Sequence, residues 1–167
     1  MTERPDIRID WSTADRVLVV AAALALGACW LLPAFAWAGL PQRIPTHFGF
    51  GGEPDAWGGR LTILALPAIA TGVHALMTVV SWIPHRYNYP WAITPGNAAA
   101  QYRLGRRVIL LLQLYINLLL AGLEWAMIAV AAGRMQSLPQ PLLIALAGPV
   151  VIVVWYLVAS HGVRSEK

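Results

Sequence analysis

Three side chains with the chemistry of metal ligands or acid–base groups stand close together in one short stretch. His47, Glu53 and Asp55 offer one imidazole and two carboxylates within nine residues. Nitrogen and oxygen ligands of this kind suit zinc or manganese, so a divalent metal site is one hypothesis. The alternative is structural, with Asp55 capping the following helix beside Arg60 and His47 bonded to the loop backbone. We favour the structural alternative, because a metal site also needs outer-shell partners that a sequence does not reveal.

A second set of polar side chains falls inside long apolar stretches. At about 100° per residue, Gln113, Asn117 and Glu124 lie within about 40° of one another on one helix face. A carboxyl group deep in a bilayer costs a few kcal/mol, so we expect Glu124 to be protonated or paired. His74, on another span, matches the estimated depth of Asn117 better than that of Glu124. This polar stripe is either a proton or ligand path, or a set of interhelical hydrogen bonds that fixes packing.

The stretches that carry these residues are long enough to cross a membrane. The chain has 167 residues, of which 58% are hydrophobic and 12% charged, and its mean hydropathy is +0.60. A soluble domain carries roughly twice that charge. We therefore predict an all-α fold: a polytopic integral membrane protein with a four-helix transmembrane bundle. The predicted spans cover residues 17–38, 61–83, 108–132 and 142–160.

Basic residues set the predicted orientation. Nine of the 12 Lys and Arg residues fall in the tails, 1–16 and 161–167, and in the middle loop, 84–107. The loops 39–60 and 133–141 carry the other three. The positive-inside rule therefore places both tails and the middle loop in the cytoplasm of a bacterial cell, in a multi-pass protein of its cytoplasmic (inner) membrane. Because the arginines flank apolar spans instead of forming one stripe, we expect no nucleic-acid partner.

The first span has a rival interpretation as a cleaved signal peptide. Ala34-Phe35-Ala36 fits a small-residue cleavage pattern. The apolar run is longer than a signal core, however, and the residues before it mix acidic with basic side chains. We therefore favour a transmembrane span.

Proline and small residues predict how the spans pack. Pro33, Pro67 and Pro149 each fall inside a predicted span, where a proline removes a backbone hydrogen bond and favours a kink. The third span instead carries a small-residue ridge, opposite the polar stripe, that suits close helix contact. This arrangement predicts neighbours on both sides of the third span. The ridge consists of Gly122, Ala126 and Ala129.

The middle loop combines aromatic and basic residues, which is typical of a membrane interface. Around Arg86 and Trp91 we predict an anchoring belt. Gly96-Asn97 predicts the start of a helix that continues into the third span. The arginines of that helix, Arg103, Arg106 and Arg107, are expected to meet anionic lipid headgroups at about 1 kcal/mol each.

The loop between the first two spans is rich in proline and glycine, which predicts a tightly turned shape, with Trp57 anchored at the interface. Its run LPxxIPTHFxxxGxPDxWG resembles the N-terminal domain of the SdpI-type bacterial membrane proteins, a domain of unknown function. Gly58-Gly59-Arg60 replaces the family's usual Gly-Ser-Lys-like ending and keeps the positive charge. The matching residues are Leu40, Pro41, Ile44, Pro45, Thr46, His47, Phe48, Gly52, Pro54, Asp55, Trp57 and Gly58.

The resemblance implies a role without catalysis. The best-described member type confers immunity to a secreted peptide toxin and sequesters a transcriptional repressor at the membrane. No phosphate-binding loop, GxSxG, zincin motif or dinucleotide fingerprint supports an enzyme, and no cofactor is predicted apart from the divalent metal hypothesis. The leading hypothesis is a binding or immunity-like protein whose outer loop and inner polar stripe recognise a peptide, lipid or envelope component. The alternatives are an accessory subunit of a larger membrane complex and, third, a small transporter or metal-dependent membrane enzyme.

Overall fold

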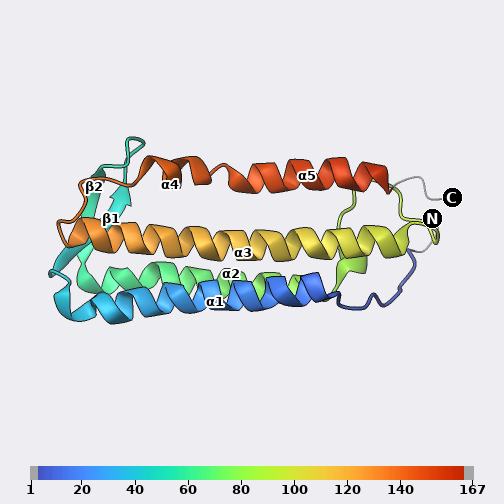
Figure 1. Cartoon of the computed structure of the whole chain (residues 1–167), viewed down its shortest axis with the longest axis horizontal. Coiled ribbons are helices and arrows are strands. Elements are labelled where there is room, and N and C mark those ends of the chain that lie inside the picture. The colour runs from blue at the N-terminus through green and yellow to red at the C-terminus, as the bar shows by residue number, and fades with distance from the viewer. Residues whose placement is uncertain (1–3, 164–167) are drawn as a thin grey trace.

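Long helices running side by side dominate the computed structural model, which describes residues 4–163 (Figure 1). Four helical stretches, counted with adjoining short turns, are long and apolar enough to cross a membrane. The first and last described residues lie at the same end of the bundle. The helices are α1 (Thr13–Ala36), α2 (Ala65–Ser81), α3 (Ala98–Ala131), α4 (Gln140–Ala145) and α5 (Gly148–Gly162).

The central element is α3, which packs against α1 and α2 on one side and against α4 and α5 on the other (Figure 1). The predicted neighbours on both sides are therefore confirmed, and Gly122 of the small-residue ridge lies against Leu142 of α4. The helix begins at Ala98, ten residues before the predicted span, directly after Asn97. The predicted continuation of the middle loop into this helix is thus confirmed.

The start of α1 is fixed by a capping box. The Ser12 hydroxyl accepts from the backbone N–H of Asp15 at 3.1 Å, and the Ser12 N–H donates to the Asp15 carboxylate at 3.0 Å. These two bonds satisfy donors that a helix start otherwise leaves unpaired. The helix therefore begins at Thr13, four residues before the predicted span.

The three prolines have different effects. Pro33 lies within α1. Pro67 lies in the first turn of α2, where the short 3-10 helix Arg60–Leu64 runs into the α-helix. Pro149 comes directly after a break, and the predicted helix 142–160 is divided into α4 and α5.

The loop between α1 and α2 folds as a two-stranded antiparallel hairpin, so the all-α prediction was incomplete. The strands β1 (Arg43–Phe48) and β2 (Pro54–Gly59) pair from Arg43 opposite Gly59 to Phe48 opposite Pro54, with an irregular register after Pro45. The many prolines and glycines resemble those of a turn and hide the alternation that marks a strand. Pairing the two halves satisfies the backbone groups of a segment that lies beside the bundle.

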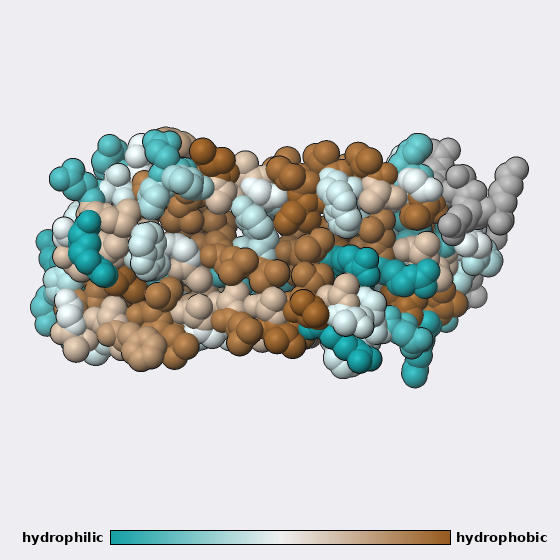
Figure 2. Space-filling view, viewed as in Figure 1, coloured by the Kyte–Doolittle hydropathy of each residue, from teal (hydrophilic) through white to brown (hydrophobic). Residues whose placement is uncertain are grey.

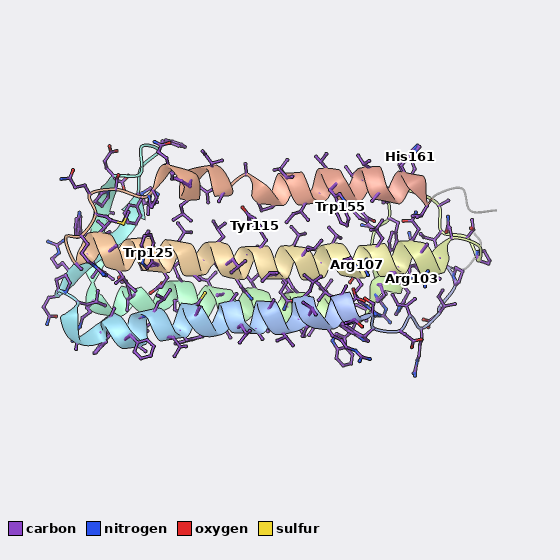
Figure 3. All side chains as sticks on the ribbon, in the orientation of Figure 1. Arg103, Arg107, Tyr115, Trp125, Trp155 and His161 are labelled. Atoms are coloured by element: carbon purple, nitrogen blue, oxygen red, sulfur yellow. The ribbon has the colours of Figure 1, made fainter. Side chains whose placement is uncertain are left out.

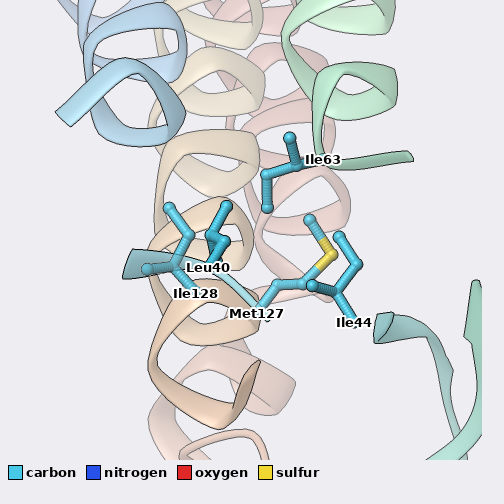
Figure 4. Packing of buried hydrophobic residues seen from close by; sticks show 5 residues of the cluster. All are labelled: Leu40, Ile44, Ile63, Met127 and Ile128. Carbon is cyan, nitrogen blue, oxygen red and sulfur yellow. The ribbon is translucent and has the colours of Figure 1, made fainter. Parts of the chain in front are cut away.

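A small apolar core lies where the hairpin meets the helices (Figure 4). Ile44 reaches it from β1, Leu40 from the residues just before that strand, Ile63 from the turn before α2, and Met127 and Ile128 from the last part of α3. This core fixes the hairpin on the bundle end opposite the described chain ends. Along the middle of the molecule, hydrophobic side chains dominate the surface, as expected for helices that face lipid (Figure 2).

Candidate functional site

The hairpin brings two of the predicted site residues together. His47 of β1 and Asp55 of β2 approach to 2.6 Å between Nδ1 and Oδ1, and their side chains are 69% and 52% exposed. When Nδ1–H donates to the carboxylate, Nε2 is left as an acceptor. The structural alternative for Asp55 was wrong, because this residue lies within a strand and pairs with His47 instead of capping α2.

Within the described residues, the other members of the predicted outer site form no hydrogen bond or ion pair with His47 or Asp55. Arg60 places its guanidinium 4.5 Å from the ring centre of Trp37, which is a cation–π contact. Trp57 and Glu53 are exposed. Within residues 4–163, no group of three or more His, Cys, Asp and Glu side chains is arranged to hold a metal ion.

A tight turn sets the hairpin tip. Gly52 has φ of +86°, a left-handed conformation that glycine adopts without strain. Its carbonyl accepts from the backbone N–H of Leu138 at 2.8 Å, and a Cβ at Gly52 would come within 3.1 Å of the Leu138 oxygen. The hairpin tip is therefore docked on the loop that leads into α4.

An apolar groove opens beside the His47–Asp55 pair. Its volume is about 550 Å³, and His47 stands at its rim. A second hollow of about 460 Å³ shares His47 and Phe48 with the first, and adds Asp55 and the fully exposed Phe50. Together we call these two hollows the outer groove. Its main apolar walls are Phe48, Ile69, Leu123, Met127, Leu138 and Leu146.

The polar stripe predicted on the third span is buried. Asn117 donates to Nδ1 of His74 at 2.8 Å, which confirms the predicted pair, and to the carbonyl of Ala22 on α1 at 2.9 Å. Gln113 donates to the Thr78 hydroxyl at 2.8 Å. These contacts join α3 to α1 and α2, so they serve as interhelical packing bonds.

Glu124 differs from the rest of the stripe. Its side chain is fully buried, and neither carboxyl oxygen has a hydrogen-bond partner among residues 4–163. A charged carboxylate in this position would be strongly disfavoured, so we expect the neutral acid.

At the opposite end of the bundle, the predicted lipid contact of Arg106 is wrong. This side chain is only 4% exposed, lies 4.5 Å from the ring centre of Trp11, and donates to the carbonyls of Ile9, Asp10 and Ser81 at 3.2–3.3 Å. It thereby fastens residues 4–12, which we call the N-terminal strap, across the bundle end.

Two tyrosines support the same strap. The Tyr102 hydroxyl donates to the Pro5 carbonyl at 2.9 Å. The Tyr87 carbonyl accepts from Arg4 at 2.7 Å. Burial raises the pKa of Tyr87 to about 12, despite the opposing effect of Arg106, so its hydroxyl stays protonated and donates to the Val80 carbonyl.

The remaining interface residues take separate places. Trp91 donates to the Ser160 hydroxyl at 3.1 Å and packs edge-on against His161 of α5, so it holds the fourth span. Arg86 is exposed. Arg103 and Arg107 lie one turn apart on α3 and line a hollow together with Ala159 and Val163 at the end of α5.

Sequence reasoning missed several residues of the outer groove. Phe50 at the hairpin tip carried a signal, because a large apolar residue within a glycine-rich turn has little reason to be there other than contact. Leu138 and Leu146 carried none, since they lie more than 80 residues further along the chain and reach the hairpin only through the fold.

Comparisons with known proteins place this hairpin within a recognised domain. Residues 24–71 match the family model for a domain of unknown function, DUF1648, and so span the second half of α1, the hairpin and the start of α2. A protein from Archaeoglobus fulgidus, described only as uncharacterized, is 31% identical over 150 residues, which cover 80% of this chain and 82% of that protein. No solved structure matches the chain. The chain therefore belongs to the same family as the archaeal protein and carries the DUF1648 domain of unknown function.

Proposed function

We propose that this chain is a non-enzymatic, immunity-like binding protein of the cytoplasmic membrane that captures a cationic amphipathic peptide at its outer end. The observation that carries the proposal is the open His47–Asp55 pair at the rim of the apolar outer groove. A polar pair beside an apolar hollow suits a ligand with both characters.

The groove has the size of a binding site. Hollows of 300–1,000 Å³ are typical for small ligands, and each of the two hollows lies in that range. Apolar side chains from Ile69, Leu123 and Met127 line the larger one. An extended or helical peptide could place one or two apolar side chains there while the rest remains at the surface.

The charge at the hairpin favours a cationic ligand. Glu53 and Asp55 are both exposed near the tip. Of the two hairpin arginines, exposed Arg43 lies opposite Gly59 at the other end of the strands, and Arg60 is engaged with the Trp37 ring. A positive group on a peptide would meet these carboxylates, and Nε2 of His47 would accept from a peptide N–H. Potentials of opposite sign both attract the ligand and select against anionic competitors.

The expected orientation and the family resemblance both favour a secreted peptide as the ligand. With the tails and the middle loop in the cytoplasm, as the basic residues favour, the hairpin faces the side from which a secreted peptide arrives. The SdpI-type resemblance of the hairpin motif implies immunity to such a peptide.

The test uses two synthetic peptides of equal length, one built from leucine and lysine and the other from leucine and glutamate. Their binding to the full chain in mild detergent is measured by calorimetry. We expect the lysine peptide alone to bind, and Asp55→Asn to weaken it about tenfold, because a hydrogen bond to a charged group contributes about 1.5–3 kcal/mol.

The matched control is Asp6→Asn. Asp6 is also an exposed aspartate beside a histidine, His85 at 3.7 Å, but lies at the other end of the bundle. Equal loss in both variants, or equal binding of the glutamate peptide, would refute the proposal. If a second membrane protein instead co-purifies in fixed ratio with the chain, the accessory-subunit alternative is supported.

A further inference from the structure

Two arginines on α3 border a crevice at the end of the bundle away from the outer groove. Arg103 and Arg107 are four residues apart, so their side chains lie one above the other on the same helix face. Figure 3 places both on the face between the start of α1 and the end of α5. In the space-filling view, the same position shows a hydrophilic patch with hydrophobic surface next to it (Figure 2).

The two guanidinium groups are held differently. Arg107 donates to the carboxylate of Asp15 at 3.4 Å and to the Ser12 hydroxyl at 3.3 Å, and its side chain is still 39% exposed. Arg103 is exposed and has no hydrogen-bond or ion-pair partner among residues 4–163. The buried carboxylate of Asp15 therefore pairs with Arg107 alone, and Arg103 leaves the patch with net positive charge.

The crevice between these arginines and α5 is apolar. Its volume is about 260 Å³, and Ala100 and Leu104 of α3 face Ala159 and Val163 at the end of α5. The two alanines leave space that larger side chains would fill. Because α5 ends within this last turn, the arginines lie at the depth where a lipid changes from acyl chain to headgroup.

We propose that Arg103, Arg107 and the α3–α5 crevice form a binding site for one anionic phospholipid. The phosphate contacts both guanidinium groups, and the upper part of one acyl chain lies against Ala100 and Ala159. Arginine suits a phosphate because its planar fork donates two parallel hydrogen bonds. A lipid without a positive headgroup is preferred, since a choline or ethanolamine would be repelled by the same pair.

The experiment is native mass spectrometry of the full chain in mild detergent, titrated with phosphatidylglycerol or with phosphatidylcholine of identical acyl chains. We expect one phosphatidylglycerol to bind at least tenfold more tightly than phosphatidylcholine. Arg103→Gln is expected to weaken the phosphatidylglycerol complex about fivefold, the effect typical of one arginine near a headgroup. Arg103 is exposed, so the melting temperature of this variant should match that of the wild type.

Two further variants separate the contribution of the arginine charge from that of the apolar crevice. Arg86→Gln removes an exposed charge at the same end but outside the crevice, and should leave binding unchanged. Ala159→Leu fills the crevice without changing charge, and should weaken binding of the anionic lipid. The proposal is overturned if both lipids bind equally, if Arg86→Gln weakens binding as much as Arg103→Gln, or if Ala159→Leu has no effect in a chain that keeps its melting temperature.

Discussion

The hydroxyl of Tyr115 donates a hydrogen bond to the backbone carbonyl of Ala145, an acceptor that Pro149 deprives of its usual helical donor. Tyr115 lies midway along α3, on the side of the broken fourth span (Figure 3). Water is absent from the hydrocarbon core, so a free carbonyl there is costly. The phenol thus replaces the missing N–H of the proline and joins the fourth span to the central helix.

Removal of this hydroxyl should destabilise the protein only when the proline is present. We expect Tyr115→Phe to cost about 1 kcal/mol in detergent unfolding, because it leaves the Ala145 carbonyl unpaired. Pro149→Ala restores a backbone donor, so Tyr115→Phe should cost much less in that background. The control is Tyr156→Phe, whose hydroxyl has no hydrogen-bond partner in the described part of the chain. Equal cost of Tyr115→Phe in both backgrounds would contradict this account.

The space beside the break should accept no side chain at Gly148. A Cβ at this position would collide with the ring and hydroxyl of Tyr115. We therefore expect Gly148→Ala to lower the melting temperature. Gly72→Ala is the control, because a Cβ there meets nothing within 4 Å and alanine favours a helix by about 0.5–1 kcal/mol. If the two substitutions shift the melting temperature in the same direction, the close approach of Tyr115 is not what requires glycine.

Glu124 should be replaceable by its neutral isostere. Both oxygens are buried without a hydrogen-bond partner among residues 4–163, so the fold gains nothing from a negative charge at this position. We expect Glu124→Gln to keep or raise the melting temperature, and Glu124→Lys to prevent folding, because a lysine at the bilayer centre costs about 3 kcal/mol or more. A hydrophobic carbodiimide, which reacts with protonated carboxyl groups, should label Glu124 in the wild type. A marked loss of stability in Glu124→Gln would show that the folded protein depends on an ionised carboxylate at this position.

Arg106 and Arg103 should respond differently to the same substitution. Arg106→Gln removes the donors to Ile9 and Asp10. It is expected to lower the free energy of unfolding by about 2 kcal/mol. It should also free the N-terminal strap, so trypsin should cleave faster after the exposed Arg8. Arg103→Gln should change neither the free energy of unfolding nor the rate of trypsin cleavage. Unchanged cleavage in Arg106→Gln would mean that other contacts hold the strap.

The features that the sequence predicts well depend on local geometry. A helix long enough to cross a bilayer requires only a run of apolar residues, and the side chains of Gln113, Asn117 and Glu124 share a face because helical spacing is regular. The depth of a residue follows from its distance to the end of its span. For this reason the sequence alone predicts the pair of Asn117 with His74, whose Nδ2 and Nδ1 atoms lie 2.8 Å apart.

Other features depend on packing between distant segments. The hairpin register slips after Pro45, and no rule of alternation predicts that His47 will face Asp55. Arg106 and Arg107 are adjacent arginines, yet one is buried beneath the strap and the other lies at a crevice, because they point to different sides of α3. Residue type and spacing near a span end cannot separate these two environments.

The position of the fourth span has a consequence for biogenesis. The apolar core at the hairpin end draws on residues from Leu40 to Ile128, and the helical contacts of α5 are mainly with α3. A ribosome that has released α3 has therefore already supplied every member of that core. The first three spans can associate as a finished unit during insertion, and the last span then attaches to an existing surface, in the manner expected when helices first insert and then pack.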